Sequence, residues 1–323
     1  MKLFNVSETQ KQIIAFVVLA FTLIALSLHI SAVIVGDDAV TTDEYAYCMY
    51  DYETKEFSTH YAPKTNATET WRFFTEREVA QMSAATAIQT SSLSSSFVET
   101  PPLEGTAASA VVYIRAYYDT DGDNVPDHTS GGSGFLVSSN VVVTAAHCFL
   151  PLESYETEEI IPGAVLMSTA IHYDQHGSTL NSLCVNASRQ YWSYGYTAAY
   201  EAVRERYDYC VIELAEPISR SFYFNCIPAE NVSIGENVRL TGYPTNYLTS
   251  TNGRIVEFVD NLMYNLKYTN ASASGMSGGP VYNSNGYCVG THRGLARSLD
   301  YYYGVLFHSQ FYSLICQRIE ANN

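Results

Sequence analysis

Three polar residues, far apart in the chain, are of the types that acyl transfer requires. His147 lies in VVVTAAHC, Asp208 in ERYDYCVIELAEPI and Ser277 in SGMSGGPV. A serine hydroxyl is a weak nucleophile at neutral pH and needs a general base, which a histidine can be. The imidazole in turn needs a buried carboxylate that fixes its tautomer and stabilises its charged form. We therefore predict Ser277 as the nucleophile, His147 as the general base and acid, and Asp208 as the orienting carboxylate.

Each string also has an ordinary structural interpretation. A histidine at a strand end is usually structural, and an aspartate before an apolar strand is most often a turn or cap residue. A Gly-x-Ser-Gly string is a common turn, although its glycines also bring backbone N–H groups close to a ligand. The combination, in the order His147, Asp208, Ser277, favours catalysis over three unrelated structural roles.

The elements that must position these residues are short strands. From residue 108 onward the chain contains many short segments rich in β-branched and aromatic residues, including VVYIRAYY, GSGFLVSS, YCVIELA, NVRLTGY and YCVGTH. Gly, Asn, Asp, Ser or Pro separates most of them, which is typical of an all-β sandwich or barrel. Near the end, Phe311, Leu314, Ile315 and Ile319 recur at helical spacing, which predicts a C-terminal helix packed on the β domain.

The three strings in this order resemble the chymotrypsin-like serine proteases, over about residues 108–323. The resemblance implies an all-β fold of two packed six-stranded antiparallel barrels with the active site between them. The segments RLTGYPTN, GRIVEF, SASGMSGGPVYN and GTHRG are similar to the glutamyl-endopeptidase (V8-like) branch. By this resemblance the backbone N–H groups of Gly275 and Ser277 form the oxyanion hole.

Met276 departs from the trypsin-like branch of this family. In that branch an aspartate precedes the nucleophile and pairs with the new N-terminal ammonium after zymogen cleavage. Met276 cannot form this ion pair, but the oxyanion donors are main-chain groups and do not need it. We therefore predict a competent site that is not activated by a trypsin-style N-terminus.

The family resemblance also suggests a substrate preference. Ala271 occupies the floor of the primary specificity pocket and offers no carboxylate to a substrate Arg or Lys. Ser272 and His292 match the positions that bind a substrate carboxylate in the glutamyl branch, and hydroxyl and imidazole donors suit that role. We expect Glu or Asp at P1, with a small-to-medium apolar P1 residue as the alternative. Arg293 either adds positive field to the pocket or points to solvent. A glycan on Asn270 would crowd the pocket, so its sequon is expected to be unoccupied or its side chain to point away.

An acidic segment, YYDTDGDNVPDHTS, resembles calcium loops of the D-x-D-G-D-x-x-P-D kind, as in thrombospondin type 3 and dockerin-like repeats. Closely spaced hard oxygen ligands on a turning backbone suit Ca²⁺. The glutamate at the twelfth position of an EF-hand loop is absent, because that position is Ser130. A solvated acidic hairpin turn is the equally open alternative, and catalysis itself needs no cofactor. The candidate ligands are Asp119, Asp121, Asp123 and Asp127.

The N-terminal region carries a targeting signal. Residues 13–36 contain no charged residue, lysines precede them and acidic residues follow, so the remainder of the chain is expected to be translocated. We expect residues 1–12 to be cytoplasmic, 13–36 to be a signal-anchor or a cleaved signal peptide, 37–104 to be a linker-like stem or zymogen propeptide, and 105–323 to be the protease domain. The protein would then be extracellular or lumenal, as a type II membrane protein or a secreted one.

Seven cysteines agree with an oxidising compartment, as do the sequons at Asn66, Asn186, Asn231 and Asn270. Spacing alone does not reveal the cysteine connectivity. In the family the cysteine after the catalytic histidine often forms a disulfide, but its usual partner position here is Gly132, so Cys184 is a possible partner of Cys148. A Cys48–Cys226 bond would tether the stem to the protease domain.

Composition limits the partners. Of the 323 residues, 47% are hydrophobic and 15% charged, so most of the chain should fold. A net charge of -16 without a Lys/Arg cluster disfavours nucleic acid. Polypeptide substrates are the expected partners, together with a membrane if the N-terminal helix is retained. The competing classes are a non-catalytic protease homologue that acts as a binding module and a calcium-dependent surface adhesion protein.

Overall fold

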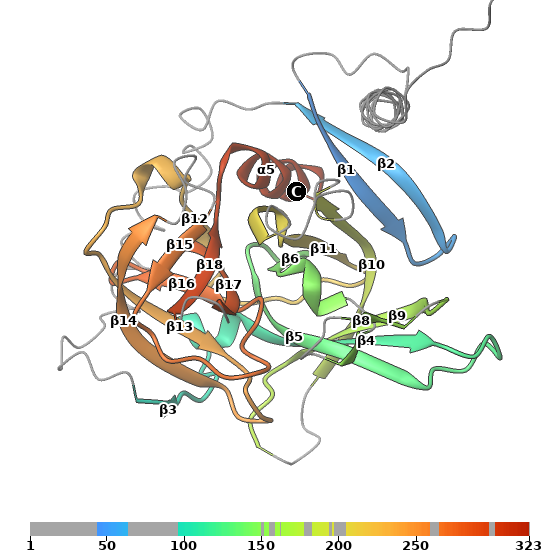
Figure 1. Cartoon of the computed structure of the whole chain (residues 1–323), viewed down its shortest axis with the longest axis horizontal. Coiled ribbons are helices and arrows are strands. Elements are labelled where there is room, and N and C mark those ends of the chain that lie inside the picture. Colours follow the sequence, from blue (N-terminus) through green and yellow to red (C-terminus); the bar gives the residue numbers. More distant parts are fainter. Residues whose placement is uncertain are drawn as a thin grey trace, which may run out of the picture. The chain divides into compact units, whose positions relative to one another are not determined.

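Two closed β-barrels contain most of the strands in the described part of the chain (Figure 1). The computed structural model describes residues 44–63, 96–149, 152–154, 159–161, 163–177, 183–193, 196, 205–258, 265–296 and 301–322. Residues Tyr45–Asn323 form one compact unit. The predicted all-β class, the two six-stranded antiparallel barrels and the C-terminal helix are confirmed.

The first barrel has the strand order β11-β6-β5-β4-β9-β10, and the pairing of β10 with β11 closes it. Every neighbouring pair in this ring is antiparallel. Its strands are β4 (Val111–Asp119), β5 (His128–Leu136), β6 (Val141–Thr144), β9 (Val165–Tyr173), β10 (Leu183–Ser193) and β11 (Cys210–Leu214). Four of them follow segments that the sequence marks as strands, whereas β9 and β10 were not among those segments.

The second barrel has the order β17-β16-β13-β14-β15-β18, and β17 pairs with β18 to close it. Its strands are β13 (Asn237–Gly242), β14 (Thr249–Phe258), β15 (Asn265–Tyr268), β16 (Pro280–Asn283), β17 (Tyr287–Ala296) and β18 (Tyr301–Leu306). Two short strands attach to this ring, β12 (Asn225–Cys226) parallel to β17 and β3 (Val98–Glu99) antiparallel to β14.

Short elements connect the barrels and their strands. They are the 3-10 helices η2 (Ala107–Ala110), η3 (Ala146–Phe149), η4 (Glu205–Tyr207) and η5 (Ala229–Asn231), and the strand pair β7 (Leu152–Ser154) and β8 (Glu159–Ile160). The C-terminal helix α5 (Ser309–Ala321) buries Phe311, Leu314 and Ile315, as its spacing predicts. The ring of Phe311 stacks on Tyr209 with a centroid distance of 4.1 Å, which joins the helix to the first barrel just before β11.

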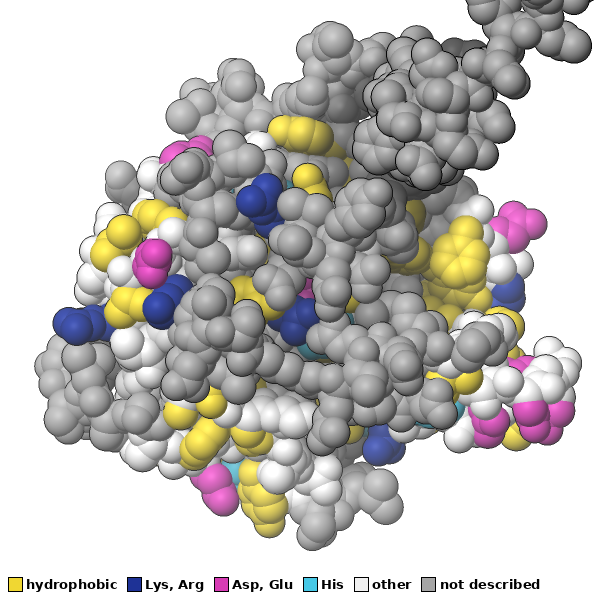
Figure 2. Space-filling model, viewed as in Figure 1, with side chains coloured by type: hydrophobic (Ala, Val, Ile, Leu, Met, Phe, Trp, Pro, Cys, Tyr) yellow, Lys and Arg dark blue, Asp and Glu magenta, His cyan; other side chains and the backbone are white. Residues whose placement is uncertain are grey.

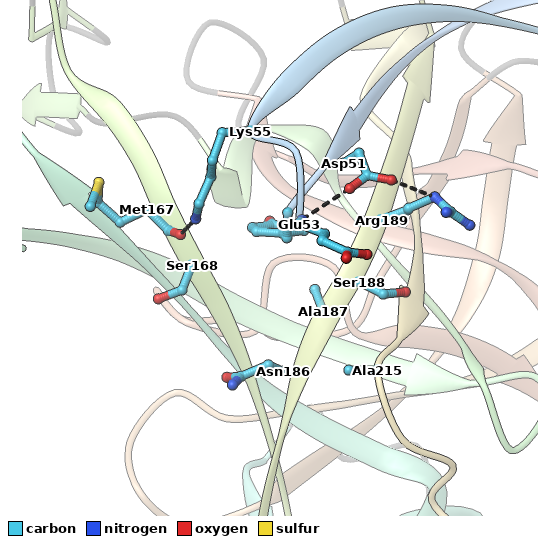
Figure 3. A pocket seen from close by; sticks show the side chains of 11 residues that line it. Asp51, Glu53, Lys55, Met167, Ser168, Asn186, Ala187, Ser188, Arg189 and Ala215 are labelled. Atoms are coloured by element: carbon cyan, nitrogen blue, oxygen red, sulfur yellow. Dashed lines mark hydrogen bonds and ion pairs between the residues drawn. The ribbon is translucent and has the colours of Figure 1, made fainter.

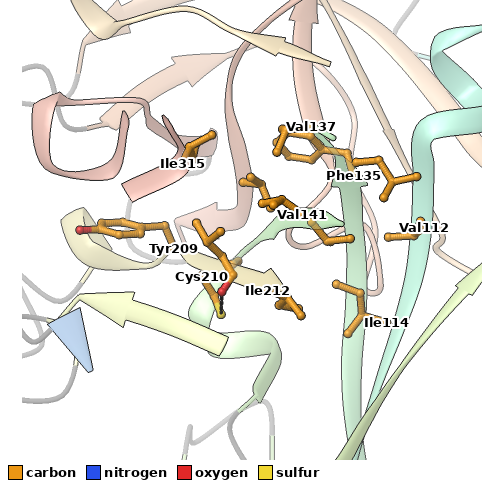
Figure 4. Packing of buried hydrophobic residues seen from close by; sticks show 14 of the residues in the cluster. Val112, Ile114, Phe135, Val137, Val141, Tyr209, Cys210, Ile212 and Ile315 are labelled. Carbon is orange, nitrogen blue, oxygen red and sulfur yellow. Dashed lines mark hydrogen bonds between the residues drawn. The ribbon is translucent and has the colours of Figure 1, made fainter. Parts of the chain in front are cut away.

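Apolar side chains fill the interior of the first barrel (Figure 4). Ile114 from β4, Phe135 from β5 and Ile212 from β11 are fully buried there. Ile315 of α5 belongs to the same cluster. Because each strand of a closed barrel turns alternate residues inward, β-branched and aromatic strands supply such a core without a broad apolar face outside.

Residues 44–63 differ from the linker-like character expected for 37–104. They form a hairpin of β1 (Glu44–Asp51) and β2 (Glu56–Pro63), and β1 pairs antiparallel with β10 of the first barrel. Closely spaced tyrosines explain the difference, because Tyr47 and Tyr50 bury their rings and still satisfy their hydroxyls. Tyr47 Oη donates to the carbonyl oxygen of Gln310 at 2.6 Å, and Tyr50 Oη to that of Leu166 at 2.9 Å. The role of 37–104 as a stem or propeptide stays a prediction.

The turn of this hairpin closes over a pocket of about 390 Å³ (Figure 3). Asp51 bonds Arg189 Nε at 2.8 Å, and Lys55 Nζ donates to the carbonyl oxygen of Met167 across the pocket. These contacts fasten the turn to β9 and β10. His147, Asp208 and Ser277 do not line this pocket.

The N-terminal predictions for residues 1–12 and 13–36 fall outside the described residues. Within the described residues, no helix has both the length and the apolar character that a membrane crossing requires. The signal-anchor and the signal peptide stay alternative predictions.

The suggested disulfides are not formed, and none of the seven cysteines is disulfide-bonded. Cys148 is buried and its Sγ lies 3.6 Å from the carbonyl oxygen of Ser277, whereas Cys184 is exposed on β10. Cys48 pairs in register with Trp192, and Cys226 pairs in register with Cys288 in the other barrel's sheet. Cys148 in η3 and Cys184 on β10 are not bonded, and Cys48 and Cys226 lie on strands of different sheets.

We predict that Tyr47→Ala destabilises the protein by about 3–5 kcal/mol, because it removes a buried aromatic ring from the junction of the hairpin, β10 and α5. Denaturant unfolding measures the change. Tyr61→Ala on the exposed strand β2 is the matched control and should shift stability by less than about 0.5 kcal/mol. Equal stability of the two variants would show that the hairpin does not support the barrel.

Candidate active site

His147 and Asp208 meet because two neighbouring strands bring them together. His147 lies in η3, which begins two residues after the end of β6, and Asp208 lies two residues before the start of β11. β6 and β11 pair antiparallel, with Thr144 opposite Cys210. His147 Nδ1 lies 2.7 Å from Asp208 Oδ2, and the His147 backbone N–H donates to Asp208 Oδ1 at 2.8 Å. The carboxylate therefore fixes both the backbone and the ring of the histidine.

Asp208 is completely buried. Burial disfavours its charged form, yet the charge and hydrogen bonds of His147 and the charge of Arg293 hold the pKa of the Asp208 carboxyl below its usual range. The group is therefore ionised at neutral pH and is suited to stabilise an imidazolium.

Ser277 lies in the turn that leads into β16. Its carbonyl oxygen accepts the Ser133 N–H at 2.7 Å, so the turn is held against β5 of the first barrel. Its hydroxyl donates to the carbonyl oxygen of Arg293 at 3.2 Å. Among the described residues no hydrogen bond joins Ser277 to His147, as is common in enzymes without substrate. The structure thus pairs His147 with Asp208 and leaves the Ser277 hydroxyl on a neighbouring carbonyl.

The turn around Ser277 presents two backbone N–H groups. The amides of Gly275 and Ser277 donate to no acceptor among the described residues, whereas Gly278 N–H donates to the His292 carbonyl oxygen at 2.7 Å. Gly275 has φ +91°, and a Cβ there would lie 2.3 Å from the carbonyl oxygen of Tyr243, so only glycine fits. The two amides are available to an oxyanion.

Met276 anchors this turn through apolar packing. Its side chain is fully buried in the core of the second barrel, together with Leu240 and Val281. Ser133, a residue that the sequence did not mark, adds a polar link. Its hydroxyl donates to the Gly275 carbonyl oxygen at 2.7 Å and accepts the Tyr243 N–H at 2.8 Å. Packing and one buried hydroxyl thus order the turn without an ion pair.

Ser272 and His292, predicted as substrate-binding residues, are in contact. Ser272 Oγ lies 2.5 Å from His292 Nε2, and His292 Nδ1 is hydrogen-bonded to Tyr268 Oη. Tyr268 Oη donates to the Tyr303 carbonyl oxygen at 3.2 Å. Tyr268 Oη carries one proton and lies closer to His292 Nδ1 than to the Tyr303 carbonyl oxygen, so the tautomer of His292 sets the direction of its bonds to Tyr268 and to Ser272.

His292 is neutral. Burial, with further contributions from His147 and Arg293, lowers the pKa of His292 to about 3. Only 1% of the residue is exposed, so water cannot compensate a charge on the ring. A positive charge on His292 would require an anion beside Ser272.

Ala271 and Asn270 border this site. The Ala271 carbonyl oxygen accepts the Thr251 hydroxyl at 2.8 Å, which fixes the segment before Ser272. Asn270 is fully buried, and its Nδ2 donates to the Thr251 carbonyl oxygen at 2.8 Å. A glycan does not fit on a buried and bonded amide, in agreement with an unoccupied sequon.

Arg293 belongs to the His147–Asp208 pair. Its Nε lies 3.1 Å from Asp208 Oδ2, and its guanidinium lies over the Tyr303 ring, 5.8 Å from the centroid. Of the two expectations for this residue, exposure to solvent is wrong, whereas its charge does act on His292 of the predicted specificity pocket. Its contact with Asp208 was not expected. The identity of the residue gave no sign of it.

The acidic turn lies at the end of the β4–β5 hairpin, where Figure 2 shows acidic side chains together. Carboxylate oxygens of Asp119, Asp121 and Asp123 lie within 4.8 Å of one another. Asp127 stands apart, because it accepts the Thr120 N–H at 2.9 Å and the Thr120 hydroxyl at 2.6 Å. Three of the four candidate ligands are therefore brought together.

The sequence and the fold were compared with protein families and with solved structures. Residues 132–290 match the family described as trypsin-like peptidase domain. A solved structure of a Glu endopeptidase in complex with MPD is 17% identical, with a TM-score of 0.52 over 70% of this chain and 96% of that one. The scabies mite inactivated protease paralogue S-I1 is also 17% identical, with a TM-score of 0.50 over 70% and 99% of the two chains. The sequence matches none of the curated proteins. Since these similar folds include an inactivated paralogue, activity must be argued from the residues.

We predict that Met276→Asp destabilises the fold by several kcal/mol, because the variant buries a carboxylate without a partner in the second core. Met276→Leu conserves volume and should cost less than about 1.5 kcal/mol. Thermal unfolding measures both. A stable Met276→Asp protein would mean that an unseen ammonium pairs with the carboxylate, as in trypsin-style activation.

Proposed function

We propose that the chain is a serine endopeptidase, because residues 132–290 match the trypsin-like peptidase domain family and the strands close into two six-stranded barrels. The observation that carries the proposal is the His147–Asp208 hydrogen bond of 2.7 Å beside a turn with two unused amides. Asp208 and Ser277 both contact Arg293, the carboxylate through its side chain and the hydroxyl through its carbonyl, so the three proposed groups share one neighbourhood.

In the proposed reaction Ser277 Oγ leaves the Arg293 carbonyl and turns to His147 Nε2. The hydroxyl proton moves to Nε2 while Oγ attacks the substrate carbonyl carbon, and Asp208 stabilises the imidazolium. The amides of Gly275 and Ser277 bind the oxyanion, a contact worth about 3–4 kcal/mol per donor in such sites. His147 then protonates the leaving amine, and water hydrolyses the acyl-enzyme by the same route. These roles follow the order of proton transfers that a serine nucleophile needs.

We predict that a fluorophosphonate labels Ser277 and that the protein cleaves a peptide mixture. Ser277→Ala should abolish both, and Ser274→Ala, at an exposed position of the same turn, should retain both. Intact-mass spectrometry and sequencing of the cleavage products are the measurements. If no form of the protein reacts or cleaves, including one cut between residues 64 and 95, the non-catalytic protease homologue becomes the better description.

We also propose a preference for Glu or Asp at P1, supported by the Ser272–His292 pair and by the absence of a carboxylate at Ala271. A substrate carboxylate would take the Ser272 hydroxyl proton and a second N–H from His292. We propose the tautomer in which Nε2 accepts the Ser272 hydroxyl in the free site, so that binding of the carboxylate brings a proton to Nε2. The carboxylate would thus raise the pKa of His292 above its value of about 3 and draw a proton from solvent. An apolar P1 residue, the alternative, leaves His292 neutral.

The proton uptake gives the preference a pH dependence. His292 is neutral before binding and charged in the complex, so a lower pH favours binding of a Glu side chain. We predict that the ratio of kcat/KM for matched P1 Glu and P1 Gln peptides falls as pH rises from about 5.5 to 8.5, a range in which Glu stays ionised. Ser272→Ala should lower the Glu/Gln ratio about tenfold or more, and Ser284→Ala, an exposed serine elsewhere, should not change it. Cleavage after Arg or Lys would contradict the assignment.

The remaining expectations stay predictions. A structural Ca²⁺ is supported by the three clustered carboxylates of the acidic turn, which are ligands that Ca²⁺ prefers. Asp127 would have to give up its bonds to Thr120 to join them. An extracellular or lumenal location, a membrane anchor and glycosylation depend on sequence signals, and the exposed Asn186 and Asn231 are the described asparagines with room for a glycan.

A further inference from the structure

We propose that Arg293 is a positioning residue that restrains the general base: by sharing the Asp208 carboxylate with His147, its guanidinium makes the imidazole less basic and shifts activity toward lower pH. The inference rests on the proposed function, because it concerns the same base. It goes beyond that function in assigning a role to the side chain of Arg293, whereas only the Arg293 carbonyl oxygen contacts the Ser277 hydroxyl.

Arg293 contacts the same Asp208 oxygen that is bonded to the ring of His147. Arg293 Nε lies 3.1 Å from Asp208 Oδ2, the same oxygen that lies 2.7 Å from His147 Nδ1. The Nε–H is not aligned for a hydrogen bond, so the interaction is mainly Coulombic. Asp208 is fully buried and the Arg293 side chain is 16% exposed, so solvent screens the pair little.

A β-bulge aims Arg293 at this place. In the β17–β18 pairing, His292 lies opposite Gly304 and Gly294 lies opposite Tyr303, which leaves Arg293 as the extra residue. Along a regular strand successive side chains point to opposite faces, and a bulge re-aims one of them. Here His292 contacts Ser272 and Arg293 contacts Asp208, so both neighbours point into the domain. The arginine is held there by the fold and by the Tyr303 ring beneath it.

The charges around His147 decide the direction of the effect. Asp208 supplies a negative charge from the segment before β11, and Arg293 a positive charge from β17. The other titratable neighbours are neutral, because burial lowers the pKa of His292 to about 3 and raises the pKa of the Cys148 thiol to about 12 and that of Cys210 well above its usual value. Arg206 lies two residues before Asp208 in η4 and is unchanged in every variant below.

An imidazolium at His147 would therefore face a carboxylate whose charge is already shared with a cation. The attraction is smaller than an unshared carboxylate would give, and the arginine repels the imidazolium directly. The guanidinium therefore disfavours the charged form of His147 relative to the neutral ring that is needed for attack. The imidazole of His147 is then also a weaker base for the Ser277 proton.

The test compares Arg293→Gln and Arg293→Met, which remove the charge, with Arg293→Lys, which keeps it. The methionine variant retains an apolar stem over Tyr303. Arg239→Gln is the control, since it removes one positive charge at a residue bonded to Asn252 in the second barrel's sheet. For each protein kcat/KM is measured against pH with a peptide whose P1 side chain is uncharged. The His147 ring is also titrated by NMR in the Ser277→Ala background, which needs no turnover.

We expect the pKa that governs the acid limb of kcat/KM, and the NMR pKa of His147, to rise by about one unit in both neutral variants. Arg293→Lys and Arg239→Gln should match the parent. Unchanged values in a folded neutral variant overturn the inference, as does a fall in rate that is equal at every pH, which is the mark of a purely structural role. If no protein cleaves but the His147 titration shifts as expected, the proposed peptidase function fails while the role of Arg293 stands.

Discussion

The buried carboxylate of Asp208 is the constraint around which the site is arranged. An ionised carboxylate removed from water must find charged or hydrogen-bonded partners. Asp208 finds them in the backbone and ring of His147 and in the guanidinium of Arg293. Closure of the first barrel brings the β6 and β11 ends together, and closure of the second brings the bulge in β17 to the same point. One group thus ties both barrels to the candidate base.

The nucleophile turn depends on the other barrel and on a different kind of interaction. Met276 packs into the second core, and the Ser133 hydroxyl from the first barrel binds the Gly275 carbonyl and the Tyr243 amide. The Ser133 N–H also holds the Ser277 carbonyl. These contacts hold the turn at the place where an aspartate at position 276 would make an ion pair in the trypsin-like branch. The two histidines near the turn differ in their hydrogen-bond partners. His147 has a carboxylate partner, whereas the buried His292 has only hydroxyl partners and stays neutral.

Much of this was accessible from local sequence. The strings around His147, Asp208 and Ser277 predicted the residues of the site, and the glycines around Ser277 predicted its turn. Most strands of both barrels and the helix that buries Phe311 followed from composition and spacing. The strands β9 and β10 did not, because their polar residues hide the alternation, as in VLMSTAIHY. The sequence also did not predict the hairpin of residues 44–63. Its tyrosines stand near a polar segment, and without knowledge of the partner strand β10 this composition is typical of a stem.

The sequence by itself determined the all-β class, the C-terminal helix, the identity of the candidate catalytic residues and the contrast between Met276 and an aspartate. These depend on residue type and on short-range periodicity, which a linear pattern contains. Only the tertiary structure decided that Arg293 faces Asp208, that Ser133 binds the turn of Ser277, that Tyr268 orients His292 and that the suggested cysteine pairs lie apart. Each of these depends on which strands become neighbours and on a one-residue bulge that reverses the facing of a side chain. Packing between residues distant in the chain determines these contacts, and a local sequence segment does not contain that information.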